Sequence, residues 1–241
     1  MSENLFWKHF HEIFESIPRQ GPGERASTLR ALGMLPRLTA NQRILDIGCG
    51  AGLQTLDLAS STEARIVALD VHPPFLAILD HNVRAKSLGD RVITQLGDMN
   101  DLPFGDQSFD VVWSEGAIFI MGFSKGLAAW RRLLVPGGYL VLSEFCWPRS
   151  DPPAEVREMF MDGDADVGSV DDRRRAIAQE GYRLLGDFEL PAAAWWDSYY
   201  VPLAKALDRF RDAHAGDPEA LDVAARSQRE IDAYRRYPEH F

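Results

Sequence analysis

The chain has 241 residues, 46% of them hydrophobic, which is enough for one α/β domain with a sizeable core. Its formal net charge of −10 at pH 7 argues against a nucleic-acid partner, because a phosphate backbone would be repelled. Two cysteines are too few for a disulfide framework or a cysteine metal cluster, and no apolar run reaches the roughly 18 residues of a membrane span. The N-terminus also lacks the pattern of a signal peptide, so we expect a cytoplasmic protein with no metal, membrane or nucleic-acid site.

The first two predicted elements are helices. Residues 3–17 carry an apolar face at helical spacing, and Pro18 ends this helix. The face consists of Phe6, Phe10, Ile13, Phe14 and Ile17. It predicts a helix that either docks on the core or covers a substrate pocket as a lid. A turn over 19–23 (RQGPG) then leads to a second helix over 24–35.

A glycine-rich loop follows the first predicted strand. Residues 44–47 form a short apolar run, and Gly48, Gly50 and Gly52 follow at alternate positions before a helical pattern begins at Leu53. Glycines in such a turn can adopt positive φ and let a ligand lie against bare backbone. The free N–H groups at the start of the next helix favour a carboxylate or phosphate. The pattern predicts the first half of a βαβ unit with a ligand at its turn.

The second and third predicted strands each end near an acid. The strand over 64–69 is followed by Asp70, which at the carboxyl edge of a parallel sheet can accept hydrogen bonds from both hydroxyls of a ribose. A helix is expected over 72–88 and a third strand over 91–96, followed by Asp98 and Met99.

The remaining core pattern continues the alternation of strands and helices. A fourth strand is expected over 110–113, shortly before Glu115, and a helix over 122–134 leads through a Pro-Gly-Gly turn to a fifth strand over 139–145. Residues 148–172 are expected to be a loop with a short helix around 154–161. A helix over 171–180, a sixth strand over 182–190, an aromatic stretch over 195–200 and helices over 202–214 and 218–236 complete the prediction.

The spacing of the loop indicates which ligand it binds. A dinucleotide site needs G-x-G-x-x-G, and Leu53 stands where its last glycine would be. The pattern here is D-x-G-x-G-x-G, beginning at Asp46, and it closely resembles the first motif of class I S-adenosylmethionine-dependent methyltransferases. The L-P-F…S-F-D-V-V run and the helix-P-G-G-strand run are also typical of that family. The resemblance covers about residues 40–190 and is greatest to the ubiquinone and menaquinone biosynthesis branch.

The resemblance implies a Rossmann-like α/β fold, a mostly parallel sheet with helices on both faces and strand order 3-2-1-4-5-7-6. We expect one methyltransferase domain over 1–241, with a helical N-terminal segment (1–38), the core (39–190) and a helical C-terminal cap (191–241). Only six candidate strands are found. Either a longer chain would supply the antiparallel seventh strand, or the sheet has a gap beside strand five.

The resemblance also implies S-adenosylmethionine as cofactor, with S-adenosylhomocysteine as product. The expected cofactor-binding residues are Asp46, Gly48, Gly50, Gly52, Gln54, Asp70, Val71, Asp98, Met99 and Glu115. In the family, an acid at the position of Asp98 bonds the adenine amino group, and the next residue, Met99, packs on the ring. Glu115 would bind the methionyl amine or touch substrate, or else be an ordinary exposed acid at a strand end.

The predicted reaction is in-line methyl transfer to a small-molecule acceptor by a monomer or homodimer. Glu115 and Tyr200 rank first as catalytic groups, ahead of other residues suited by type to be a base: His9, His11, His72, Glu144 and Tyr199. Aromatic side chains of the flanking segments either line the substrate pocket or join the cap to the sheet; they are Phe6, Phe10, Phe14, Trp195, Trp196, Tyr199 and Tyr200. The alternatives are a cofactor-binding protein or cyclase without methyl transfer, and a nicotinamide oxidoreductase.

Overall fold

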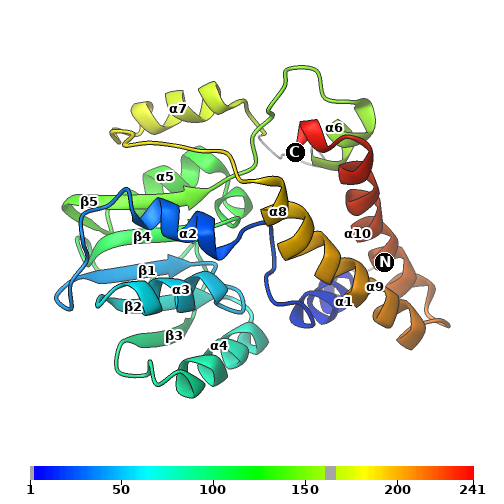
Figure 1. Cartoon of the computed structure of the whole chain (residues 1–241), viewed down its shortest axis with the longest axis horizontal. Helices are drawn as coiled ribbons and strands as arrows, with labels where there is room; N and C mark the ends of the chain where they lie inside the picture. Colours follow the sequence, from blue (N-terminus) through cyan, green and yellow to red (C-terminus); the bar gives the residue numbers. More distant parts are fainter. Residues whose placement is uncertain (1–2, 161–166) are drawn as a thin grey trace.

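The computed structural model describes residues 3–160 and 167–241. Its centre is a sheet of five parallel strands in the order β3-β2-β1-β4-β5 (Figure 1). The strands are β1 (Arg43–Ile47), β2 (Arg65–Asp70), β3 (Val92–Leu96), β4 (Phe109–Glu115) and β5 (Leu134–Ser143). This order confirms the Rossmann-like arrangement for the first five predicted strands.

Helices cover both faces of the sheet, which explains why β1 is apolar on both sides. On one face, Ile44 packs with helices α2 (Arg25–Leu32), α3 (Leu53–Ser61) and α4 (Pro73–Ala85). On the other face, Leu45 and Ile47 pack with α5 (Phe123–Arg131) and α7 (Val170–Gln179). A short 3₁₀ helix, Ile118–Ile120, follows β4.

The remaining helices form a cap beyond the carboxyl ends of the strands (Figure 1). They are α1 (Glu3–Glu15), α6 (Ala154–Phe160), α8 (Ala192–Trp195), α9 (Val201–Ala213), α10 (Pro218–Arg236) and a final 3₁₀ turn, Pro238–His240. A π-helical turn, Trp196–Tyr200, joins α8 to α9. The first helix of the chain packs against the last two long helices, so both ends of the sequence build one apolar cluster. The predicted helical segments at the two ends are therefore present.

The prediction of a sixth strand over 182–190 is wrong. No strand is assigned there, and Leu184 and Leu185 are 42% and 51% exposed. A strand-like sequence forms a strand only where its backbone pairs with a neighbouring strand. Here the segment contacts the rest of the protein through its side chains instead. The Tyr182 hydroxyl donates to the Leu127 carbonyl oxygen at 2.9 Å, and Phe188 lies under the Arg30 guanidinium.

One further boundary differs from the prediction. The Pro136-Gly137-Gly138 run lies inside β5 rather than in a turn before it, because Gly137 adopts φ +78° and the pairing with β4 shifts register between Phe109 and Val111. The short helix expected around 154–161 is present as α6, and residues 161–166 of the expected loop lie outside the described part of the chain. None of the described helices combines the length and the apolar character needed to cross a bilayer.

Candidate functional site

The glycine loop lies at the carboxyl end of β1, where the strand order turns from β2 on one side to β4 on the other. This is the switch point at which open parallel sheets bind ligands. Gly48 and Gly50 have φ of +70° and +54°, values that side-chain-bearing residues rarely adopt. A Cβ on Gly48 would stand 2.6 Å from the Cβ of Ala117, and one on Gly50 would stand 2.5 Å from Oε1 of Gln20. The conformation and packing of this loop therefore require glycine at these two positions.

Asp70 holds this loop from the end of the neighbouring strand. Its Oδ2 accepts a hydrogen bond from the Gly50 amide at 2.8 Å, and its Oδ1 accepts one from the His72 amide at 2.9 Å. The residue is 9% exposed, so it is not completely enclosed. Each oxygen keeps a further lone pair, which a ligand hydroxyl can use.

Residues 19–23 brace the same loop from the N-terminal side. Gln20 accepts a hydrogen bond from the Ala51 amide at 2.8 Å, and its side-chain nitrogen donates to the carbonyl oxygens of Phe14 and Ile17. Arg19 is 7% exposed and reaches the end of β4. The sequence reasoning noted this turn but gave neither side chain a role. Its compact Arg-Gln-Gly-Pro-Gly composition was the only available signal.

Arg19 and Glu115 form a buried ion pair at the carboxyl edge. Oε2 of Glu115 accepts from Nη1 of Arg19 at 2.8 Å, while Oε1 accepts from the Thr28 hydroxyl at 2.8 Å and from Nε1 of Trp113 at 3.0 Å. Their side chains are 8% and 12% exposed. Glu115 is thus not an ordinary exposed strand-end acid. Three donors hold its carboxylate in place, and Oε2, which accepts from Arg19, keeps a further lone pair for a ligand group.

Two predicted cofactor-binding residues are buried beneath the glycine loop and are not exposed to a ligand. Asp46 is fully buried and accepts a hydrogen bond from the Thr55 hydroxyl at 2.5 Å. Burial, with Glu115 nearby, raises the pKa of the Asp46 carboxyl from 3.8 to about 7. Gln54 is buried as well and donates to the Cys49 carbonyl oxygen at 2.9 Å. Both side chains stabilise the loop and the start of α3, so their contribution to ligand binding is indirect.

Three other predicted cofactor-binding residues follow β2 and β3 and lie beside the glycine loop. Val71 is 66% exposed immediately after β2. Asp98 is exposed, and hydrogen bonds from the backbone and side chain of Asn100 lower the pKa of its carboxyl. Met99 is half-buried, with its Cε 3.5 Å from the position of a Cβ on Gly48. These side chains follow β2 and β3 and flank the glycine loop.

The histidines suggested as bases divide between two places. His72 lies beside Asp70, and its Nε2 is 2.7 Å from Oε1 of Glu15 on α1. The His11 ring stacks on His72 with centroids 3.9 Å apart, and burial lowers the pKa of His11. These contacts join α1 to the start of α4. His9 lies instead against the turn between α9 and α10.

Tyr200 and Tyr199 belong to the interior of the cap. Tyr200 is fully buried and donates from its hydroxyl to Oε1 of Glu230 at 2.9 Å. Burial raises the pKa values of both tyrosines, which opposes the formation of a phenolate base. Glu144 is also buried, 3.9 Å from Nη2 of Arg173. A catalytic role for Tyr200 stays a prediction, and its contacts favour a structural one.

The aromatic side chains of the flanking segments pack mainly on one another. Phe10 stacks on Phe14 with centroids 4.1 Å apart, and Trp196 stacks on Tyr234 at 6.0 Å. Phe14, Tyr199 and Tyr200 are buried, and the others are half-buried against the same cluster. These contacts favour the interpretation that the aromatics join the cap together.

The known proteins that this chain resembles in sequence are described as methyltransferases. The family described as "Methyltransferase domain" matches residues 45–142. A demethylmenaquinone methyltransferase of Mycobacterium sp. (strain KMS) is 32% identical over 167 residues, covering 67% of this chain and 71% of that protein. The regions shared with three other curated methyltransferases cover 57%, 43% and 39% of those proteins, so the chain spans about half of their length.

Two solved structures share the fold. A SAM-dependent methyltransferase from Geobacter sulfurreducens, in complex with S-adenosyl-L-homocysteine, has a TM-score of 0.81 at 21% identity and covers 97% of this chain and 93% of its own. The cyclase SpnF has a TM-score of 0.69 at 20% identity and covers 93% and 82%. At these identities the likeness concerns the fold alone.

Proposed function

Because the chain belongs to the S-adenosylmethionine-dependent methyltransferases, we propose that it transfers a methyl group from S-adenosylmethionine to a small-molecule acceptor. Family membership confirms the resemblance predicted from the D-x-G-x-G-x-G motif. The observation that carries the proposal is the glycine loop at the switch point, held by Asp70 from the next strand. Glycines at positive φ leave this backbone without side chains, which suits a ligand that lies directly on the loop.

The adenosine end of the cofactor fits the residues after β2 and β3. Asp70 is the candidate for the ribose hydroxyls, since both of its oxygens are held in place by backbone amides. Met99 and Val71 offer apolar surface to the adenine ring, and the exposed Asp98 offers an acceptor to its amino group. The charge at Asp98 is kept by its bonds from Asn100.

The methionyl end fits the buried pair beyond β4. Arg19 directs one guanidinium nitrogen to Glu115 and has other N–H groups available for the cofactor carboxylate. Glu115 is the candidate acceptor for the cofactor amine, and its bonds from Thr28 and Trp113 fix its orientation. This arrangement supports a binding role for Glu115 rather than that of a base.

The acceptor site is proposed at the same edge of the sheet. Phe119 and Ile120, in the 3₁₀ helix after β4, are 63% and 61% exposed, and Leu96 at the end of β3 is 59% exposed. Ligand pockets are mostly apolar with a few placed polar groups, so these side chains support an acceptor with an apolar part. They lie on the sheet side, whereas the aromatic residues expected from the sequence to line the pocket belong to the flanking segments.

Methyl transfer requires the protein mainly to align the cofactor methyl group with the acceptor atom. When bound, S-adenosylmethionine supplies a methyl group already activated by its sulfonium. The chain's residues orient both partners and exclude water, and correct orientation accounts for much of the barrier reduction in such reactions. The ion-paired carboxylate of Glu115 and the buried hydroxyl of Tyr200 support a mechanism without a dedicated protein base. The alternative of a cyclase, prompted by the fold of SpnF, would use the same binding site without releasing S-adenosylhomocysteine.

Binding at this site is tested by calorimetry with S-adenosylmethionine, S-adenosylhomocysteine and NADH. We expect the first two to bind and NADH not to bind. Asp70→Asn should weaken S-adenosylhomocysteine binding about tenfold or more, the effect of losing hydrogen bonds to a charged group. Asp90→Asn is the matched control, since Asp90 is exposed. A 2′-deoxyribose analogue should lose affinity for the wild type and little for Asp70→Asn. Unchanged affinity in Asp70→Asn would contradict the assignment.

A further inference from the structure

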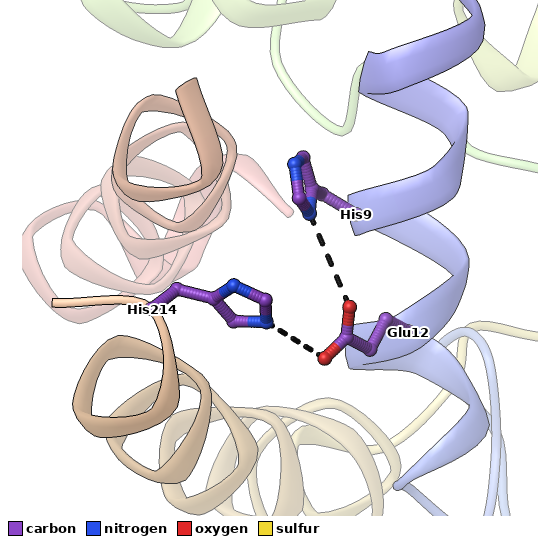
Figure 2. A group of neighbouring side chains, drawn as sticks. All are labelled: His9, Glu12 and His214. Atoms are coloured by element: carbon purple, nitrogen blue, oxygen red, sulfur yellow. Dashed lines mark hydrogen bonds and ion pairs between the residues drawn. The ribbon is translucent and has the colours of Figure 1, made fainter. Parts of the chain in front are cut away.

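Side chains from opposite ends of the sequence meet in the cap, where α1 faces the turn between α9 and α10. His9 and Glu12 lie one turn apart on α1, while His214 ends α9 and Asp217 begins α10. Figure 2 shows Glu12 between the two imidazoles, with His9 and Glu12 projecting from one helix towards His214. One ligand-type atom from each of His9, Glu12 and His214 lies within 4.8 Å of the others.

The individual distances are compatible with one shared ion. Nε2 of His214 is 2.8 Å from Oε1 of Glu12, and Nδ1 of His9 is 4.0 Å from Oε2 of the same carboxylate. Ligands about 2.0–2.1 Å from a tetrahedral Zn²⁺ stand roughly 3.3–3.5 Å from one another. The observed distances lie on both sides of that value, so small side-chain rotations would bring three ligands to one point.

His9 provides a second and independent observation. Its side chain is only 2% exposed, yet neither ring nitrogen has a hydrogen-bond partner among the described residues. A neutral imidazole always carries one N–H donor and one acceptor, and leaving such groups unsatisfied in the interior costs about 1–3 kcal/mol. The nearest carboxylate oxygens are the Glu12 oxygen on the Nδ1 side and Oδ2 of Asp217, 3.7 Å from Nε2. A cation on the Nδ1 side would satisfy the acceptor.

We propose that His9, Glu12 and His214 form a binding site for a divalent transition-metal ion of the Zn²⁺ type. Two imidazoles and one carboxylate are a ligand set that such ions prefer, whereas Mg²⁺ and Ca²⁺ prefer oxygen ligands. His9 binds through Nδ1 and His214 through Nε2, and water completes the coordination. Metal-bound histidines usually donate their other N–H to a carboxylate, and Asp217 stands where it can accept from Nε2 of His9.

The position of Asp217 is fixed independently of any ion. Its Oδ1 caps α10 by accepting from the amides of Glu219 and Ala220 at 3.0 and 3.1 Å, which leaves Oδ2 directed towards His9. The two carboxylates also balance the charge of a divalent ion. The net charge of −10 on the whole chain favours cations further.

The proposed ion would fasten α1 to the turn between α9 and α10. These helices already pack together, but no hydrogen bond from residues 3–160 or 167–241 holds the His9 ring. The role is therefore structural, and it does not depend on the methyl-transfer proposal. It also departs from the expectation of no metal, which rested on the small number of cysteines and on a reaction that needs no metal.

The test uses the full chain, freed of metal with a chelator. Zn²⁺ should bind with one equivalent in calorimetry and raise the melting temperature, and Co²⁺ should give the visible absorption bands of a four-coordinate site. Glu12→Gln and His214→Ala should each weaken binding about tenfold or more and abolish those bands. Asp217→Asn should also weaken binding, while Asn preserves the helix cap. His81→Ala, at an exposed histidine of α4, is the matched control and should bind as the wild type does.

Each outcome decides the proposal. Because Glu12 and His214 are more exposed than His9, their variants are expected to fold, and circular dichroism checks this. Binding lost in these variants and retained in His81→Ala supports the site. The proposal is overturned if the metal-free wild type takes up no Zn²⁺ and shows no thermal shift. Equal affinity in the wild type and the Glu12 and His214 variants would also overturn it, since the ion would then lie elsewhere.

Discussion

The buried carboxyl of Asp46 predicts a specific pH dependence of stability. Its side chain accepts one hydrogen bond from Thr55, and its other oxygen, Oδ1, has no partner among the described residues. Burial raises the pKa of this carboxyl from 3.8 to about 7 in the folded chain. The folded state therefore favours the protonated acid. The stability that protonation contributes is fully present below pH 3.8 and is lost as the pH rises through about 7.

The expected size follows from the two pKa values. At about 1.4 kcal/mol per pH unit, the interval from 3.8 to about 7 corresponds to roughly 4 kcal/mol. Asp46→Asn replaces the acid by a neutral group of the same shape, so it should remove this dependence. Urea unfolding of both proteins at several pH values between 4 and 8.5 measures the difference in unfolding free energy. The variant should gain up to that amount relative to the wild type as the pH rises.

Other titrating groups are common to both proteins and cancel in this difference. Asp90→Asn, at an exposed position, should show a flat difference over the same range. A difference between the wild type and Asp46→Asn that does not change from pH 4 to pH 8.5 would refute the reasoning. It would mean that the fold does not raise the pKa of this carboxyl.

Three further substitutions test contacts around the site. Glu115→Gln leaves the Arg19 guanidinium buried without its counter-charge, so unfolding free energy should fall by about 3–5 kcal/mol in urea. Gly50→Ala places a methyl group 2.5 Å from a neighbouring side-chain oxygen at φ +54°, so calorimetry should detect a loss of S-adenosylhomocysteine binding. Tyr200→Phe removes the donor to Glu230 and should lower stability by about 1–3 kcal/mol, with KM and kcat of the folded enzyme unchanged.

Matched controls exist for the first two of these. Glu63→Gln breaks an exposed pair with Arg37 at 3.7 Å and should change stability by less than about 1 kcal/mol. Gly89→Ala adds a methyl group where, apart from the adjacent residues, no atom of the described chain lies within 4 Å, so it should bind cofactor normally. A lowered kcat in Tyr200→Phe at full folding would restore the predicted catalytic role of that hydroxyl.

The parts of the site that the sequence predicted are those encoded locally. The glycine loop and Asp70 belong to consecutive elements of one βαβ unit, and glycine spacing reports the backbone directly. The contacts of Arg19 with Glu115 and of Gln20 with Ala51 span 96 and 31 positions. No periodicity joins such residues, so only the fold could reveal them.

The wrong strand and the contacts that the sequence did not indicate have the same physical origin. The segment 182–190 has a strand-like composition, but a strand needs a paired neighbour, which local sequence does not encode. The hydrogen bond from the Tyr200 hydroxyl to Glu230 joins residues 30 positions apart, and the catalytic role of Tyr200 stays a prediction. His9 and His214 lie more than two hundred positions apart, so no ligand spacing could have indicated a shared ion.

The central claim is methyl transfer, and the most direct measurement follows the methyl group itself. The purified chain is incubated with S-adenosylmethionine labelled in the methyl group and with pooled small metabolites, and both labelled products and S-adenosylhomocysteine are quantified. The account predicts labelled small molecules in amounts equal to the S-adenosylhomocysteine released, and their loss in Asp70→Asn but not in Asp90→Asn. Tight cofactor binding without release of S-adenosylhomocysteine, while a substrate is converted without label, would contradict the account and identify a cyclase-type use of the site.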